Sequence, residues 1–140
     1  MIDLNKFIKA QDEWIDKVKI ELKSKKKVSH WIWFIFPQLK GLGNSFISDY
    51  YGIDNINDAK KYYENIKLRN NLIDCLSIIS EYEGINELKD CLGELDTKKL
   101  YSCVSLFYLA TDQSIFKYII DKFFNGKLDE EMILLLKRGD

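Results

Sequence analysis

The sequence has few arginines, one histidine and one proline. Only two of its 21 basic residues are arginines, Arg69 and Arg138, and 22 acidic residues bring the net charge to −1. Arginine supplies most bidentate contacts to phosphates and bases, so its scarcity and the near-neutral charge argue against nucleic-acid binding. No apolar run approaches the roughly 18 residues of a membrane span, and residues 1–6 lack the basic-then-apolar order of a signal peptide. We therefore expect a cytoplasmic protein that binds neither nucleic acid nor membranes.

Cysteine is also scarce. The chain has three, Cys75, Cys91 and Cys103, with no CxxC pair among them. Each lies among apolar residues at helical spacing, so we expect small buried thiols. A zinc site formed with His30, or a cysteine–histidine nucleophile pair, lacks the ligand spacing or local signature that it would need. We predict no metal and no cofactor.

Apolar residues recur at helical spacing along nearly the whole chain, and capping residues precede most of these stretches. We therefore predict an all-α fold, a single helical domain over residues 1–140 with about seven helices around a central buried one. The helix expected at Lys98–Ala110 is apolar on almost every side, which is typical of a central helix. Four large side chains should lie in the core: Trp31, Phe34, Leu106 and Phe107.

The stretch Ser29–Gln38 concentrates the unusual residues, since it holds the only histidine, the only proline and two of the three tryptophans. Ser29 is a good N-cap for a short helix at His30–Phe36. Pro37, the next residue, disfavours a helical conformation at Phe36, the last residue of this expected helix. Periodicity alone does not exclude a buried strand here. The lysine-rich run Lys23–Lys27 just before it is expected to be a solvated loop, or else an electropositive rim beside His30.

Several polar residues occupy positions where the sequence pattern predicts an apolar residue or, in the first turn of a helix, an uncharged or acidic one. Gln11 interrupts the apolar stripe of the first helix, so its amide either bonds a core neighbour or faces a ligand pocket. Lys98 and Lys99 lie in the first turn of the expected Lys98–Ala110 helix, where the macrodipole disfavours cations. In one interpretation, the lysines extend their charged ends to solvent and the Ser102 hydroxyl bonds the backbone. In the other, a lysine and the free N–H groups at the helix N-terminus together bind an anion.

The central motif resembles the signature of a bacterial family catalogued as domain of unknown function 1810. The matching residues are Ser29, His30, Trp31, Trp33, Phe34, Ile35, Phe36, Pro37, Gln38, Leu39, Gly41, Leu42 and Gly43. The segments Phe7–Gln11, Lys99–Phe107 and Phe123–Gly126 are similar to other parts of the family pattern, so the resemblance covers nearly the whole chain. It implies a small, mostly helical, cytoplasmic domain and does not imply an activity.

These residues together suggest a ligand site. We predict that the chain binds, or acts on, a small anionic nucleotide-like or nucleotide-sugar ligand in a pocket around His30, the natural candidate for acid–base catalysis. Gln11, His30 and Lys99 should converge on that pocket. The expected ligand-binding residues are Gln11, Trp31, Trp33, Gln38, Lys99 and Ser102. Gln11 or Gln38 would bind an amide or base edge, Trp31 or Trp33 would stack on a planar ring, and Lys99 with the helix N-terminus would bind a phosphate.

The alternative is a non-catalytic protein-interaction module whose polar groups form a structural network. In that interpretation His30 caps backbone within a solid core. The sequence leaves open whether the chain is an enzyme, which substrate it would take, and what its oligomeric state and partners are. An enclosed pocket lined by His30 and Lys99 would favour a ligand.

Overall fold

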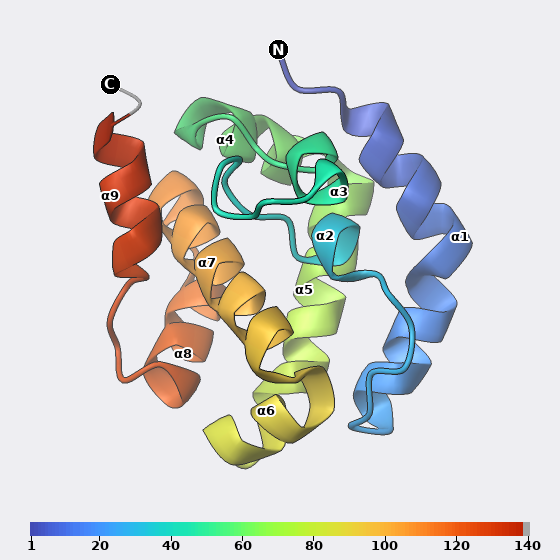
Figure 1. The fold of residues 1–140 in the computed structure, drawn as a ribbon. Coiled ribbons are helices and arrows are strands. Elements are labelled where there is room, and N and C mark those ends of the chain that lie inside the picture. The colour runs from blue at the N-terminus through green and yellow to red at the C-terminus, as the bar shows by residue number, and fades with distance from the viewer. Residues whose placement is uncertain (139–140) are drawn as a thin grey trace.

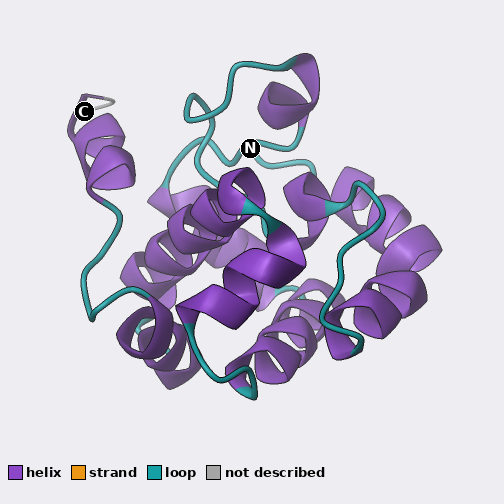
Figure 2. Ribbon diagram, turned by 60° about the horizontal axis from the view of Figure 1, so that its bottom comes forward, coloured by secondary structure: helices purple, strands orange, loops and turns teal. Residues whose placement is uncertain are grey.

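Residues 1–138 of the computed structural model form nine helices, seven of them at least seven residues long (Figure 1). Residues 139–140, the last two of the predicted domain, lie outside the described part of the chain. No strand is present among the described residues (Figure 2), so the predicted all-α class is confirmed. The helices are α1 (Leu4–Lys23), α2 (Ile32–Ile35), α3 (Phe46–Tyr50), α4 (Ile56–Glu64), α5 (Ile66–Ser80), α6 (Ile85–Leu92), α7 (Glu94–Thr111), α8 (Ser114–Phe123) and α9 (Glu130–Arg138).

Helix α7 is the centre of the fold. It packs against α4, α8, α6, α2 and α9, and half of its eighteen residues are buried. Helices α1 and α9 lie at opposite edges of the molecule (Figure 1), and α1 packs against α5. The four side chains expected in the core, Trp31, Phe34, Leu106 and Phe107, are all buried. The prediction of a central, all-round apolar helix is therefore confirmed.

The start of α7 differs from the prediction. The helix begins at Glu94, after Gly93 with φ of +85°, and not near Lys98. Its first turn carries Glu94 and Asp96, which complement the positive end of the helix dipole. The lysines at positions 98 and 99 consequently lie in the second turn. The lysines are therefore not in the first turn as predicted, and an anion site at the N–H groups of this helix stays a prediction.

The segment between α1 and α2 is held by a buried carboxylate. Glu21 accepts hydrogen bonds from the backbone N–H groups of Val28 and Ser29 (2.8 and 3.0 Å), from the Ser29 hydroxyl (2.7 Å) and from Nε1 of Trp31 (3.0 Å). Ser29 therefore does not cap a helix at His30, as predicted. Helix α2 starts only at Ile32 and has no side-chain cap.

The lysine run before α2 is only partly the solvated loop that was expected. The side chain of Lys27 is 7% exposed; its Nζ lies 2.8 Å from an Asp96 carboxylate oxygen and 5.0 Å from the centre of the Trp31 ring. Lys27 thus ties the loop to the first turn of α7, while Lys23, Lys25 and Lys26 are exposed.

The chain after α2 is extended and pairs briefly with the segment before α4. The N–H of Lys40 donates to the carbonyl of Ile53 (2.8 Å), and the N–H of Ile53 donates to the carbonyl of Gln38 (2.9 Å). Gly43 then passes so close to α3 that an added Cβ would lie 2.5 Å from Ser48. These contacts fix the end of the aromatic motif against the segment before α4 and against α3. Within residues 1–138, no helix is both long and apolar enough to cross a bilayer.

Candidate functional site

A small polar hollow lies where the end of the aromatic motif, the second turn of α7 and the residue before α9 meet. Its volume is about 210 Å³. Three of the predicted site residues, Gln38, Lys99 and Ser102, line it together. The other lining residues are Leu42, Gly43, Leu95, Lys98 and Asp129. We call this hollow the Ser102 cavity.

The Ser102 hydroxyl is the unusual group in this cavity. The residue is only 2% exposed, and its Oγ has no hydrogen-bond partner among the described residues. An unpaired buried hydroxyl costs free energy, and native proteins contain few of them. Its neighbour Ser105 is different, since the Ser105 Oγ accepts a hydrogen bond from the N–H of Asp129 (3.0 Å). Of the two interpretations of Ser102, a backbone-bonded serine is therefore wrong, although Ser105 does bond a backbone group in this way.

Asp129 supplies the acidic group of the cavity. Its carboxylate accepts a hydrogen bond from the N–H of Glu131 (3.2 Å) at the start of α9. Burial raises the pKa of this carboxyl, and the hydrogen bonds that it accepts work in the opposite direction. The Ser102 hydroxyl lies close enough to this carboxyl to contribute to that lowering of the pKa, although its geometry falls short of an ordinary hydrogen bond. The cavity therefore offers a strong acceptor next to a hydroxyl that makes no well-formed hydrogen bond.

Two lysines supply the positive charge. Lys98 is exposed at the mouth of the cavity, and the side chain of Lys99 is 23% exposed. Lys99 lies 3.6 Å from Asp96, but the carboxylate of Asp96 also holds Lys27 at the shorter distance of 2.8 Å. The pairing of Lys99 is therefore weak, and its ammonium can bind a further anion. The side-chain amide of Gln38 makes no hydrogen bond to another described residue and so adds a free donor and acceptor.

Gln11 is not part of this cavity. It is 1% exposed; its Nε2 donates to the carbonyl of Phe34 (2.7 Å) and to the Tyr62 hydroxyl (2.8 Å), and its Oε1 accepts from the amide of Asn71 (2.8 Å). This is the first of the two interpretations of Gln11, an amide that bonds core neighbours. The prediction that it shares a pocket with Lys99 is wrong, because all of its polar atoms are used inside the core.

The aromatic motif also has a structural role at Trp31. Its side chain is 0% exposed, with one edge bonded to Glu21 and Lys27 beside the ring. A buried ring of this kind has no free face on which a ligand could stack, so the stacking role predicted for Trp31 is wrong. Trp33 is partly buried and packs against the core. Neither tryptophan lines the Ser102 cavity.

His30 lies apart from the Ser102 cavity. Its side chain is exposed, and it lines neither the Ser102 cavity nor any of four larger hollows on the described surface. The predicted convergence of Gln11, His30 and Lys99 on one pocket is therefore wrong. Trp31, the next residue, turns inward to Glu21 and leaves the imidazole on the outside. A catalytic role for His30 stays a prediction.

The three cysteines are free and buried, as predicted. Burial raises the pKa of Cys75 to about 12 and raises those of Cys91 and Cys103. Thiols with raised pKa values are poor nucleophiles and poor metal ligands at neutral pH. Within the described residues, no group of three histidine, cysteine or acidic side chains is placed to hold a metal ion.

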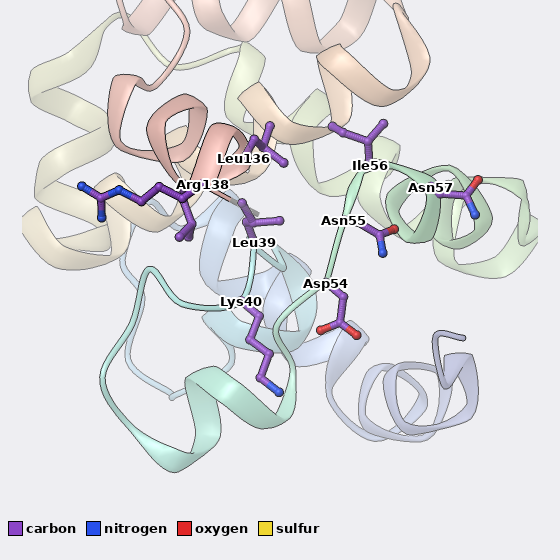
Figure 3. Close-up of a pocket in the computed structure, with 9 residues that line it drawn as sticks. Leu39, Lys40, Asp54, Asn55, Ile56, Asn57, Leu136 and Arg138 are labelled. Atoms are coloured by element: carbon purple, nitrogen blue, oxygen red, sulfur yellow. The ribbon is translucent and has the colours of Figure 1, made fainter. Parts of the chain in front are cut away.

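A larger hollow of about 610 Å³ lies between α9 and the segment before α4 (Figure 3). All of its polar lining residues are exposed. One of them, Asn55, caps α4, since its Oδ1 accepts a hydrogen bond from the N–H of Asp58 (2.8 Å). Figure 3 shows Arg138 and Asn57 pointing away from the other labelled side chains. This hollow contains no unpaired buried polar group, so the Ser102 cavity is the better candidate.

Sequence reasoning missed Asp129 as a site residue. An aspartate before an amphipathic segment is typical of a helix cap, and Asp129 does cap α9. Nothing in the sequence shows that α9 returns to α7 and places this carboxyl beside Ser102. Leu42 and Gly43 belong to the family motif, but nothing in the sequence shows that they line this cavity.

The fold and the site together define a small all-α domain with a polar cavity at its central helix. Residues 1–136 match the family described as Protein of unknown function (DUF1810), so the chain belongs to that family. The resemblance seen in the central motif is thereby confirmed. The structure is similar to that of the conserved hypothetical protein Rv1873 from Mycobacterium tuberculosis, with 34% sequence identity, a TM-score of 0.91 and 96% of each chain covered. No significant match was found among curated proteins.

Proposed function

We propose that this chain binds a small hydroxylated anion, such as a sugar phosphate, in the Ser102 cavity. The observation that carries the proposal is the buried Ser102 hydroxyl, which has no partner among the described residues and lines a cavity. Evolved sites often break the rule that buried polar groups are paired, because the ligand supplies the missing partner.

The chemistry of the lining residues supports both parts of such a ligand. Lys98 and Lys99 are suited to a phosphate or carboxylate, since charge-assisted hydrogen bonds are among the strongest that a protein makes. Asp129 accepts hydrogen bonds and so favours a ligand that carries hydroxyl groups. Gln38 and Ser102 each both donate and accept, and they suit a hydroxyl group equally well.

The volume limits the size of the group that enters. A water molecule occupies about 30 Å³ in the liquid, so a 210 Å³ cavity accommodates roughly seven such volumes. That is enough for a phosphate and part of a sugar, and too little for a whole nucleotide. The nucleotide-like ligand predicted from the sequence would therefore place only part of itself here.

The alternative, a protein-interaction module with a structural polar network, has support elsewhere in the molecule. The closed networks around Gln11 and Glu21 are of that kind, because all of their polar atoms have partners. The Ser102 cavity is not closed in this way. A ligand therefore explains this part of the molecule better than a scaffold does.

Binding can be tested with ribose 5-phosphate as the probe, by isothermal titration calorimetry. Lys99→Ala is expected to weaken binding about five- to hundredfold, the range expected for a lost charge-assisted hydrogen bond. Lys117→Ala is the matched control, since Lys117 is also paired with an aspartate, Asp121, but lies outside the cavity. Equal affinity in both variants, or no binding by the wild-type chain to this or other sugar phosphates, would contradict the proposal.

Stability gives a second test that needs no ligand. Ser102→Ala is expected to leave the free energy of unfolding unchanged or to raise it by up to about 1 kcal/mol, because it removes an unpaired hydroxyl. Ser105→Ala, three residues along the same helix, is expected to lower it by about 1–3 kcal/mol because the N–H of Asp129 loses its acceptor. Urea unfolding measures both. A comparable loss in the two variants would mean that the Ser102 hydroxyl is bonded within the protein.

A further inference from the structure

A second hollow of about 360 Å³ adjoins the Ser102 cavity. Lys98 lines both, so the second turn of α7 forms the ridge between them. On one side of this ridge lie Lys99 and Ser102, and on the other lie Thr97 and Tyr101. Residues three and four apart share a helix face, so one helix presents different surfaces to the two hollows.

The wall of the second hollow is aromatic. The rings of Tyr101 and Phe124 are stacked, with centroids 4.1 Å apart and an angle of 13° between their planes. The Tyr101 hydroxyl donates to the carbonyl of Lys127 (2.6 Å), which fixes the orientation of the ring. Both rings are only partly buried. Because the two rings cover one face of each other, a further planar ring would stack on an outer face of this oriented pair.

The second hollow is also positively charged. Lys89, Lys98 and Lys127 line it with a single acidic residue, Glu94. Lys89 lies 3.7 Å from Glu94, and both of these side chains are largely exposed. The remaining lysines flank the aromatic pair. Lys98 therefore lies between the polar cavity and the aromatic wall.

We infer that the ligand is a phosphate ester that carries an aromatic or heteroaromatic ring, bound across both hollows. This inference rests on the proposed function, because the Ser102 cavity holds the hydroxylated part of the same molecule. The phosphate lies in the Ser102 cavity near Lys99, and the hydroxylated part follows beside Ser102 and Lys98. The ring, bonded to the hydroxylated part, then crosses the ridge at Lys98 and stacks against the pair formed by Tyr101 and Phe124. Volumes of 210 and 360 Å³ together fall in the usual range of ligand pockets, roughly 300–1,000 Å³.

The test compares two probes that differ only in the ring: ribose 5-phosphate and adenosine 5′-monophosphate. The wild-type chain is expected to bind the mononucleotide about ten- to hundredfold more tightly, the range expected for one base stacked on an aromatic side chain. Phe124→Leu is expected to remove most of this gain. Tyr118→Leu is the matched control, since Tyr118 is an exposed ring on α8 outside both hollows.

The outcomes separate this inference from the proposed function. If both probes bind with equal affinity and Lys99→Ala weakens both, the Ser102 cavity binds its anion and the inference about the ring is wrong. If neither probe binds, the proposed function fails as well. If Phe124→Leu does not fold, saturation-transfer NMR on the wild-type chain with adenosine 5′-monophosphate tests whether the ring contacts the protein. Strong transfer to the adenine protons supports the inference, and transfer confined to the ribose protons contradicts it.

Discussion

Replacing Phe107 with alanine is expected to lower the free energy of unfolding by about 3–5 kcal/mol, the usual cost of truncating a buried phenylalanine. The side chain is 0% exposed, and its ring lies 5.2 Å from that of Tyr62 and 5.8 Å from that of Phe116, measured between centroids. It therefore joins α7 to α4 and α8, and alanine would leave a cavity where these three helices meet. Urea unfolding followed by circular dichroism measures the change.

Leu109→Ala is the control for this substitution. Leu109 lies two residues away on α7 but is 43% exposed, so its truncation is expected to cost less than about 1 kcal/mol. A similar loss in the two variants would mean that helix α7 is destabilised by any substitution. Retention of stability within about 1 kcal/mol in Phe107→Ala would contradict the placement of α7 at the centre of the fold.

The central position of α7 could be predicted because its sequence contains the information directly. A helix that is apolar on every side must be covered on every side, and only the segment that contains Leu106 and Phe107 has this pattern. The residues that cover it come from five other helices, and each of those has an apolar stripe of its own. Burial of this kind requires no particular partner, so it can be recognised without knowing which helix meets which.

The first turn of α7 could not be placed in the same way. Asp96 and Thr97 carry the side chains of N-caps, and the predicted helix began just after them. In the structure the Thr97 hydroxyl donates to the carbonyl of Gly93 (2.7 Å), four residues earlier, inside the helix. A threonine at a cap and one bonded back within a helix look alike in a sequence. Only Gly93, with its positive φ, marks the true start.

The same limit applies to the candidate site. Gln11 and Ser102 both interrupt apolar surfaces, and the sequence marks both as unusual. The partners of Gln11, Tyr62 and Asn71, lie 51 and 60 residues further along the chain. Whether such partners arrive depends on how the helices pack. The sequence therefore identifies polar residues in unusual places, and the packing decides which are closed networks and which are open to a ligand.

Glu21 has no unusual feature in the sequence, but in the structure it is buried and accepts four hydrogen bonds. At 6% exposure it lies in the interior, although its position in α1 resembles that of an ordinary surface glutamate. Burial by itself would raise the pKa of this carboxyl. The hydrogen bonds from Ser29, Val28 and Trp31 outweigh that effect and lower the pKa from 4.5 to about 2. The carboxylate thereby attaches the start of the aromatic motif to α1.

Glu21→Gln is expected to lower the free energy of unfolding at pH 7 by about 3 kcal/mol, since each unit of pKa shift corresponds to about 1.4 kcal/mol. A pKa lowered by folding means that the stabilisation is complete above the pKa of the unfolded chain. It is lost as the pH falls from about 4.5 toward 2. The difference in stability between wild type and Glu21→Gln should therefore be constant above about pH 5 and shrink below it. Urea unfolding between pH 2.5 and pH 7 measures this difference.

Glu13→Gln supplies the comparison on the same helix. Glu13 is exposed, and its replacement is expected to change stability by less than about 0.5 kcal/mol. A difference between wild type and Glu21→Gln that stays the same down to pH 2.5 would show that the substitution acts by disturbing packing and not by removing a charge. Because Trp31 donates to the Glu21 carboxylate, its fluorescence should report the same titration. The emission of the wild-type chain should change as the carboxylate is protonated, and that of Glu21→Gln should not.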